Sequence, residues 1–162
     1  MNHKIVIYPG TFDPIHMGHV DIVERASRIF DEVIIAIAVN IDKNPLFSVD
    51  ERIELAVGAT SHVKNIKALS TDGLIADLAK EYSACGLIRG LRHVSDFEYE
   101  FQMATMNNHL NPSVSTLLMV TSDKYVHINS SMVKNVSKLN GDIAKYVPNN
   151  VLLALKQKFK HS

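Results

Sequence analysis

The chain has 162 residues, of which 46% are hydrophobic and 21% are charged, a composition that excludes a disordered, collagen-like or disulfide-rich protein. One hydrophobic core can serve a chain of this length, so we expect residues 1–162 to form a single domain. Its 17 basic and 17 acidic side chains give a formal net charge of +0, and this balance disfavours nucleic acid and anionic membranes as partners.

The first predicted unit is a strand, a helix and a second strand. Residues 4–8 and 33–39 carry apolar, β-branched runs, which are typical of strands buried on both faces of a parallel sheet. Between them, Val20, Val23 and Ala26 recur at helical spacing and predict an amphipathic helix over residues 19–30. These three elements make a βαβ unit.

Strands and helices continue to alternate along the chain. Ser48 and Glu51 form a capping box, because each side chain can bond a backbone amide at the other residue, and they predict a helix to about Thr60. A strand near Lys67, a helix to about Tyr82 and a strand over residues 86–89 are expected next.

The rest of the chain predicts one strand and three helices: a helix capped by Ser95 with Glu98 and ending near His109, a strand over residues 116–120, a helix from about Ser130 to residues 140–141, and a helix opened by Pro148. The whole pattern predicts an α/β fold, doubly wound around a five-stranded parallel sheet. In such folds ligands bind beyond the carboxyl ends of the strands, near the switch in strand order.

The single cysteine, Cys85, cannot form an internal disulfide, and we expect it to be a small buried filler between Ala84 and Gly86. The longest apolar run covers only residues 33–39, whereas a membrane-spanning helix needs about 20 residues. The apolar run before Pro9 is too short for the hydrophobic part of a secretory signal, so we expect none here. We therefore expect a cytoplasmic protein without a membrane segment.

A turn-rich loop, residues 8–19, leads from the first strand into the first helix. We expect an anion here, because free helix amides and the positive end of the helix dipole attract phosphate. Gly10 and Gly18 allow close approach of the backbone, Thr11 carries a hydroxyl, and His16 and His19 are donors that can become cationic. Turn chemistry and helix capping are the alternative explanations for these residues. Two histidines without a ligand cluster give little support to zinc.

Three further strand-end segments carry groups that suit phosphate. Arg89 and Arg92 lie at the end of the fourth strand and offer two guanidinium forks, although they could instead pair with the acidic residues that follow them. Lys43 follows the second strand, where a surface lysine is the ordinary explanation. Asn129, Ser130 and Ser131 follow the fifth strand and could cap a helix or bind phosphate. Because these segments share one edge of the sheet, they predict one site.

Together these residues resemble a known family. The segments Gly10-Thr-Phe-Asp-Pro-Ile-His-Met-Gly-His19, Arg89-Gly-Leu-Arg92, Asp96-Phe-Glu-Tyr-Glu100 and Ile128-Asn-Ser-Ser131 are similar to those of the phosphopantetheine adenylyltransferases of bacterial coenzyme A synthesis. The resemblance covers essentially the whole chain. The His-x-Gly-His element is shared with other nucleotidyltransferases and class I aminoacyl-tRNA synthetases, and the second and third segments narrow the match. Asn129 stands where the family usually has a serine.

The resemblance implies a Rossmann-like nucleotidyltransferase that joins ATP and 4'-phosphopantetheine into dephospho-coenzyme A and pyrophosphate, with Mg²⁺ accompanying the nucleotide and with a homohexameric assembly. It implies catalytic roles for His19, Thr11, Lys43 and Arg92. It implies ATP contacts from Thr11, Phe12, His19, Gly90, Arg92, Glu100, Tyr125, Ser130 and Ser131. It implies contacts to phosphopantetheine from Thr11, Lys43, Leu74 and Arg89, and no protein cage for the metal.

Two other functions remain open at this point. A related nucleotidyltransferase could act on nicotinate mononucleotide or glycerol 3-phosphate, and an assay with each acceptor separates these enzymes. A nucleotide-binding module without turnover would bind ATP and release no pyrophosphate.

Overall fold

A computed structural model of the chain describes residues 3–39 and 44–159. Its strands are β1 (Ile5–Gly10), β2 (Glu32–Ala38), β3 (Ile66–Thr71), β4 (Gly86–Leu91) and β5 (Ser115–Val120). Its helices are α1 (Met17–Ser27), α2 (Val49–Ala59), α3 (Ile75–Glu81), α4 (Val94–Leu110), α5 (Ser130–Lys138) and α6 (Asn149–Lys158). The alternation that the sequence predicts is therefore confirmed.

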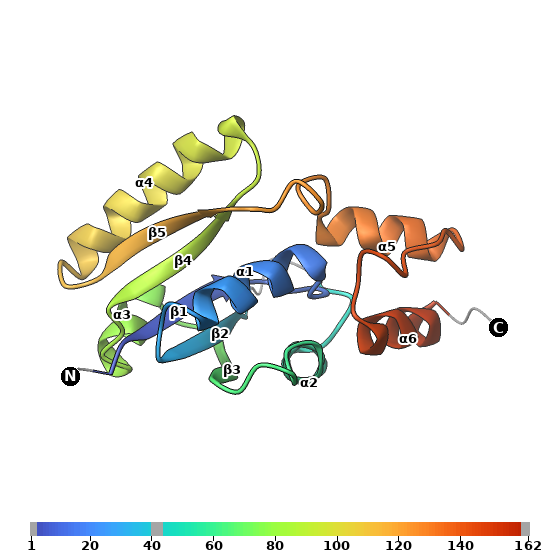
Figure 1. Cartoon of the computed structure of the whole chain (residues 1–162), viewed down its shortest axis with the longest axis horizontal. Coiled ribbons are helices and arrows are strands. Elements are labelled where there is room, and N and C mark those ends of the chain that lie inside the picture. The colour runs from blue at the N-terminus through green and yellow to red at the C-terminus, as the bar shows by residue number, and fades with distance from the viewer. Residues whose placement is uncertain (1–2, 40–43, 160–162) are drawn as a thin grey trace.

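The five strands form one parallel sheet in the order β3-β2-β1-β4-β5. The chain first adds β2 and β3 on one side of β1 and then adds β4 and β5 on the other side. The switch in strand order therefore lies between β1 and β4. The carboxyl ends of the strands point toward α5, as Figure 1 shows. This is the edge at which a doubly wound sheet binds its ligands.

Hydrophobic cores lie on both faces of the sheet, which explains the continuous apolar runs of β1 and β2. Val6, Val33 and Ile35 face α1 and α2, whereas Ile7 and Ile34 face the side of α3. All five side chains are fully buried. Burial of a whole aliphatic side chain contributes roughly 1.5–3 kcal/mol, so these central strands anchor the fold.

Two of the predicted helix ends are confirmed, and one is wrong. Ser48 and Glu51 form the predicted capping box at the start of α2. Asn140 takes a positive φ of 60° after α5 and turns the chain where the sequence predicts a stop. The predicted box of Ser95 and Glu98 does not form, because Asp96 accepts the His93 amide at 3.1 Å and α4 starts at Val94.

Cys85 also differs from its prediction. It is exposed rather than buried, and its thiol donates a hydrogen bond to the backbone oxygen of Ile5 at 3.2 Å. The apolar neighbours in the sequence suggested a core position, but Cys85 precedes β4 at the amino edge of the sheet, where the side chain reaches solvent.

The helix α4 and the outer strand β5 carry a broad apolar surface. Within α4, only Glu100 is buried in this chain. The large hydrophobic side chains that stay exposed on these two elements are Val94, Phe97, Tyr99, Phe101, Met103, Met106, Leu110, Leu117 and Val120. With 3.6 residues per turn, Phe97 and Phe101 lie on the opposite side of α4 from Met103 and Met106, so the set covers two sides of this helix and the strand β5. We call this set the α4–β5 face. Separately, none of the described helices is both long and apolar enough to cross a bilayer.

Candidate active site

Two cavities lie at the carboxyl edge of the sheet, beside the switch between β1 and β4. The first, of about 260 Å³, is lined by the ends of β1 and β4, the start of α1 and the segment before α5. The second, of about 410 Å³, lies between the loop after β1, residues 44–45 and the start of α5. Ser130 lines both cavities and so joins them.

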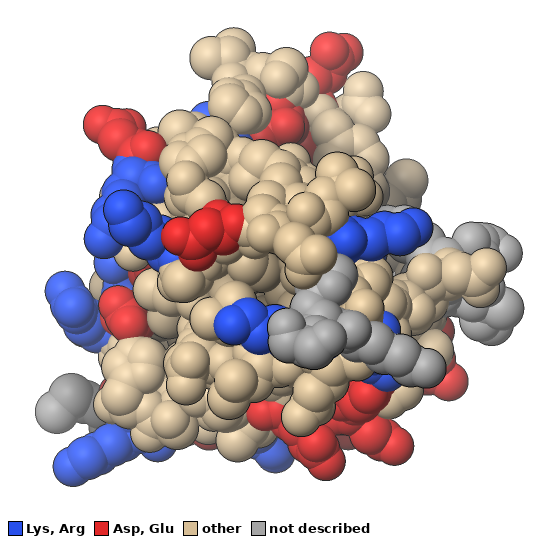
Figure 2. All heavy atoms as spheres, turned by 90° about the vertical axis from the view of Figure 1, so that its right-hand side faces the viewer, with Lys and Arg blue, Asp and Glu red and all other residues tan. Residues whose placement is uncertain are grey.

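Figure 2 shows the molecule from the side of α5 and α6, and both acidic and basic side chains lie on this face. The positive charge near the cavities therefore comes from individual lining side chains and not from a uniformly basic face. Arg89 and Arg92 line the first cavity, and Lys134 lines the second.

The start of α1 is completed by its own histidines. His16 is the N-cap residue, and its Nδ1 accepts the Gly18 amide at 3.1 Å. The Met17 amide donates to the Tyr146 oxygen, and the His19 amide donates to the His16 oxygen, both at 2.9 Å. The expectation that α1 offers free amides to an anion is therefore wrong, because a side chain and a neighbouring loop already accept them.

The imidazoles of His16 and His19 are neutral donors. They stack with ring centroids 3.6 Å apart, and the His16 amide donates to His19 Nδ1 at 3.1 Å. An amide N–H can only donate, so each Nδ1 is an unprotonated acceptor and each Nε2 carries the proton. Since His19 lines the first cavity, its Nε2 is the group available to a ligand.

Burial sets the charge state of these rings. Burial, and to a smaller extent Arg92, lowers the pKa of His16 to about 3. Burial also lowers the pKa of His19 well below its ordinary value, with further contributions from His16, Arg92 and Arg89. These two rings, although able in principle to become cationic, are therefore neutral at neutral pH, because a charged ring would be desolvated near guanidinium groups.

Arg89 lies within β4 and Arg92 directly follows it; both pair with acidic residues and line the first cavity. Arg89 binds Glu100 with both arms, from Nε to Oε2 at 2.8 Å and from Nη2 to Oε1 at 3.0 Å, and it donates to the Pro9 oxygen at 3.0 Å. Burial opposes the charged guanidinium, but the hydrogen bond and attraction from Glu100 raise the pKa of Arg89. Arg92 lies 3.7 Å from Asp96 and keeps a partly exposed side chain.

The start of α5 differs from the start of α1. The Asn129 side chain accepts the Met132 amide at 2.8 Å and caps the helix. The Ser130 hydroxyl donates to the Pro14 oxygen at 2.9 Å, so its lone pairs remain available as acceptors. Neither the Ser130 amide nor the Ser131 amide has an acceptor among residues 3–39 and 44–159. This helix start can therefore bind an anion.

Comparison with known proteins identifies the family. Residues 7–136 match the cytidylyltransferase-like family. Phosphopantetheine adenylyltransferase of Clostridium botulinum strain Eklund 17B is 50% identical over 92% of this chain and 94% of its own length. The enzyme of that name from Caldanaerobacter subterraneus is 46% identical over 98% of this chain and 99% of its own. The chain belongs to the phosphopantetheine adenylyltransferase family. That of Heliobacterium modesticaldum is 48% identical over 96% of this chain and 92% of its own.

A solved structure supports the fold assignment of this phosphopantetheine adenylyltransferase family member. A Vibrio parahaemolyticus protein with the provisional name nicotinate-nucleotide adenylyltransferase superposes with a TM-score of 0.74 over 99% of this chain and 98% of its own. The two sequences are 18% identical, so the likeness concerns the fold. The predicted nucleotidyltransferase fold is confirmed.

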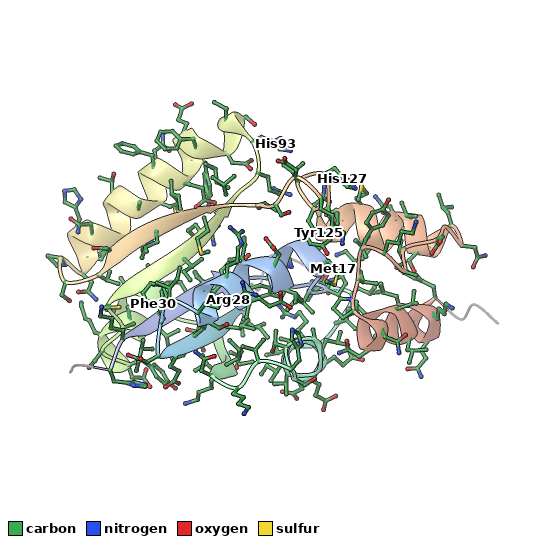
Figure 3. The ribbon with its side chains drawn as sticks, viewed as in Figure 1. Met17, Arg28, Phe30, His93, Tyr125 and His127 are labelled. Atoms are coloured by element: carbon green, nitrogen blue, oxygen red, sulfur yellow. The ribbon has the colours of Figure 1, made fainter. Side chains whose placement is uncertain are left out.

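The structure brings together most residues that the family resemblance singles out. Those that line the first cavity are Phe12, His19, Arg89, Gly90, Arg92, Glu100, Tyr125 and Ser130. Thr11 and Ser131 line the second cavity. Figure 3 shows Tyr125 near Met17 at the start of α1, and Tyr125 lines the first cavity. Leu74, 57% exposed, precedes α3 and lines neither cavity, and Lys43 lies outside the described residues.

Gly90 has a specific packing reason to be glycine. A Cβ at this position would lie 2.7 Å from the Ile22 side chain and 3.6 Å from the Tyr8 hydroxyl. A larger residue would therefore push α1 or fill the floor of the first cavity.

Sequence reasoning missed several polar groups around the site. Tyr8 and Thr121 line the first cavity, and Asp13 and Lys134 line the second. The buried Arg52 donates to the Thr11 oxygen at 2.8 Å and to the Ala38 oxygen at 3.1 Å. Asp13 stands within the quoted loop motif, which was a usable signal. Arg52 and Lys134 occupy ordinary helical positions, and no local pattern distinguishes them.

Proposed function

We propose that this protein transfers the adenylyl group of ATP to 4'-phosphopantetheine and forms dephospho-coenzyme A and pyrophosphate. Membership of the family supports the reaction. The observation that carries the proposal is geometric: a neutral His19 donor, Arg92 and Ser130 line one cavity at the switch point of the sheet. An adenylyl transfer needs such donors around the phosphorus that is attacked.

The proposed reaction needs no covalent enzyme intermediate. The acceptor phosphate, whose second pKa is near 6, is mostly ionised at neutral pH and can attack without a general base. Its oxygen forms a bond to the α-phosphorus of ATP, while the bond from that phosphorus to the bridging oxygen breaks. The departing pyrophosphate keeps the electron pair. The protein therefore has to align the groups and stabilise negative charge.

We assign the charge-stabilising roles to groups on both sides of the first cavity. His19 Nε2 donates to the α-phosphate, where the five-coordinate phosphorus develops. Arg92 and the start of α5, with Ser130 and Ser131, bind the β- and γ-phosphates. The free amides of α5 support this assignment, because an anion would complete that helix start.

We assign the remaining roles by position. Phe12, Gly90, Glu100 and Tyr125 border the nucleoside. Both Glu100 oxygens already accept from Arg89, but each oxygen has a second lone pair that can accept a ribose hydroxyl. Thr11 and Arg89 are assigned to the acceptor phosphate and the pantetheine respectively, and Lys43 and Leu74 are assigned to the same two groups from the family resemblance alone.

Mg²⁺ is proposed to accompany the nucleotide. Within residues 3–39 and 44–159, no group of three or more His, Cys, Asp or Glu side chains lies together. Mg²⁺ commonly binds substrate phosphates and water with few protein ligands, so this donor set fits a nucleotide-borne ion. When bound, the ion would neutralise charge on the outer phosphates. Chelation with EDTA should abolish pyrophosphate release, and added Mg²⁺ should restore it.

The function is tested by offering ATP with one phosphorylated acceptor at a time. We expect pyrophosphate release with 4'-phosphopantetheine and at least about 100-fold slower release with nicotinate mononucleotide or glycerol 3-phosphate, since a site built for one acceptor leaves polar groups unpaired with another. Release only with a different acceptor would overturn the substrate assignment. ATP binding without release under any acceptor would identify a binding module.

The assembly and the location are also proposals. The α4–β5 face exceeds what single scattered apolar side chains expose, and such surfaces mark contacts between proteins. We propose that further copies of this chain cover it in a homohexamer. We propose the cytoplasm as the location, which cell fractionation with a tagged chain can check.

A further inference from the structure

Asp13 has no role in the proposed chemistry, although it lies at the centre of the site. It stands in the loop after β1 and is 4% exposed. It lines the second cavity together with Thr11 of its own loop and Ser131 of α5.

The carboxylate of Asp13 joins three segments that are far apart in the sequence. Oδ1 accepts the Phe47 amide at 2.9 Å, and Oδ2 accepts the Leu46 amide at 2.9 Å. Oδ2 also pairs with Lys134 Nζ of α5 at 2.6 Å. One side chain therefore connects the loop after β1, the segment before α2 and the first turns of α5.

Only a carboxylate can make all these bonds. An asparagine side chain has one acceptor oxygen, and its NH₂ group would face an amide donor or the Lys134 ammonium. The Lys134 side chain is 26% exposed and the Asp13 side chain is 5% exposed, so loss of the charge would leave a partly buried ammonium unpaired.

The two segments that Asp13 holds both line the second cavity and form two of its walls. Asn44 and Pro45, just before the bonded amides, line one wall, and Ser130 and Ser131 line the other. We infer that Asp13 is a positioning residue that sets the spacing between these walls, and thus between the acceptor phosphate and the triphosphate. This inference rests on the proposed function, which places the two substrates on these sides.

The inference predicts a separation of turnover from binding. Each substrate meets one wall in its own complex, whereas the transition state needs both walls at once. A misplacement of about 1 Å can cost about 100-fold in rate, so we expect Asp13→Asn to lower kcat about 10- to 100-fold. The dissociation constants of ATP and of phosphopantetheine, each measured alone by calorimetry, should change less than about threefold.

Calorimetry also separates this effect from misfolding. The variant should bind ATP with the same stoichiometry as the wild type, which a smaller folded fraction would not. Asp77→Asn is the matched control, because Asp77 pairs with Lys80 at 3.3 Å on the exposed side of α3. The control should keep wild-type kcat and KM.

Lys134→Met provides a second variant that leaves both backbone bonds to Asp13 in place. We expect it to lower kcat in the same direction, and we expect Asp13→Asn with Lys134→Met to lose no more than Asp13→Asn alone. If Asp13→Asn does not fold, Lys134→Met still tests whether the contact between Asp13 and Lys134 supports turnover. A loss of ATP affinity in Lys134→Met beyond about tenfold would show direct triphosphate binding and would overturn the positioning role.

Amide hydrogen exchange tests the geometry without turnover. The amides of Leu46 and Phe47 should exchange at least about tenfold faster in Asp13→Asn than in the wild type. If the wild type releases no pyrophosphate with any acceptor, the proposed function fails while this readout still decides whether Asp13 holds the wall. Unchanged exchange, unchanged kcat, or a rise in one KM alone would each overturn the inference.

Discussion

His19 enters the cavity as a neutral donor, because its Nδ1 is occupied by the His16 amide. Removal of the ring should therefore remove one preorganised hydrogen bond rather than a positive charge. Loss of one such donor typically costs about 3–4 kcal/mol in the transition state.

We expect His19→Ala to lower kcat about 10²- to 10³-fold and to leave ATP affinity nearly unchanged. His19→Gln should recover part of the loss, since its amide nitrogen can lie near the position of the imidazole Nε2. Pyrophosphate-release kinetics measure both variants. Near-normal turnover of His19→Ala would remove His19 from the mechanism.

The buried histidines also predict how stability depends on pH. The pKa of His16 is lowered on folding, so the unfolded chain binds more protons below its ordinary pKa of about 6.5. Its contribution is complete above that pH and is lost as the pH falls. Each such histidine should cost about 1.4 kcal/mol for each pH unit below 6.5, down to its lowered pKa.

His16→Ser isolates this effect, because serine can still cap α1. Urea unfolding of both proteins between pH 7 and pH 5 should give a shallower fall in stability for the variant. Parallel profiles for the two proteins would show that His16 does not titrate between the folded and unfolded states.

For single residues, the sequence predicted which side chains share a site better than it predicted their protonation states. His19, Arg92 and Ser130 were placed in one site because strand ends meet at one edge. The neutral state of His19 depends on its burial and on the charges of His16, Arg92 and Arg89. Spacing along a chain does not report these surroundings.

Among the helices, α5 gives the clearest test of how much an N-cap side chain stabilises the protein. Asn129 accepts the Met132 amide, so it performs the capping role itself. Loss of an N-cap side chain costs about 1 kcal/mol.

We expect Asn129→Ala to lower the free energy of unfolding by about 1 kcal/mol, and Asn129→Ser to keep it within a few tenths. Urea titrations at neutral pH measure both. An equal loss in the two variants would show that the Asn129 contact is not the stabilising one.

The helix starts also show why some local patterns mislead. Ser95 and Glu98 have the spacing of a capping box, but Asp96 accepts both the Arg92 and His93 amides and starts α4 earlier. Ser48 and Glu51 have no such competitor, and their box forms. Two overlapping caps cannot be ranked from spacing alone, because the geometry of the preceding strand end decides between them.

The whole molecule leaves the α4–β5 face uncovered. Phe101 is 58% exposed and Met106 is 57% exposed, although both are large and apolar. If other copies cover this face, a charge placed there should separate the subunits, because a buried unpaired carboxylate is costly.

We expect Met106→Glu to shift the sedimenting species from an assembly toward the 18.0 kDa chain. Leu139→Glu is the control, since Leu139 is 82% exposed at the end of α5, away from the α4–β5 face, as Figure 1 shows. Its assembly should match the wild type. A wild type that sediments as a single chain at micromolar concentration would contradict the proposed hexamer.

The fold class followed from the alternation of β-branched runs and helical repeats. The order β3-β2-β1-β4-β5 did not, because short loops allow a strand to join either side of a sheet. The second cavity also could not be predicted from the sequence, because it depends on the contact of Lys134 with Asp13, 121 positions earlier. That residues 1–162 form one domain stays a prediction.

The contrast between α1 and α5 implies that a bound nucleotide changes the backbone hydrogen bonding at the start of α5 but not at the start of α1. The first turn of α1 is already closed by His16 and Tyr146, whereas the leading amides of Ser130 and Ser131 meet no acceptor within residues 3–39 and 44–159. A bound phosphate would accept the two α5 amides that the Asn129 cap leaves free, and it would find no such free amides at Met17 and His19 of α1. Saturation with a non-hydrolysable ATP analogue should therefore slow deuterium uptake at Ser130 and Ser131, while uptake at Met17 and His19 stays as it was. The hydrogen bonds around His19 would then be complete before the nucleotide binds. Those at the start of α5, which binds the leaving pyrophosphate, would be completed only by the substrate itself.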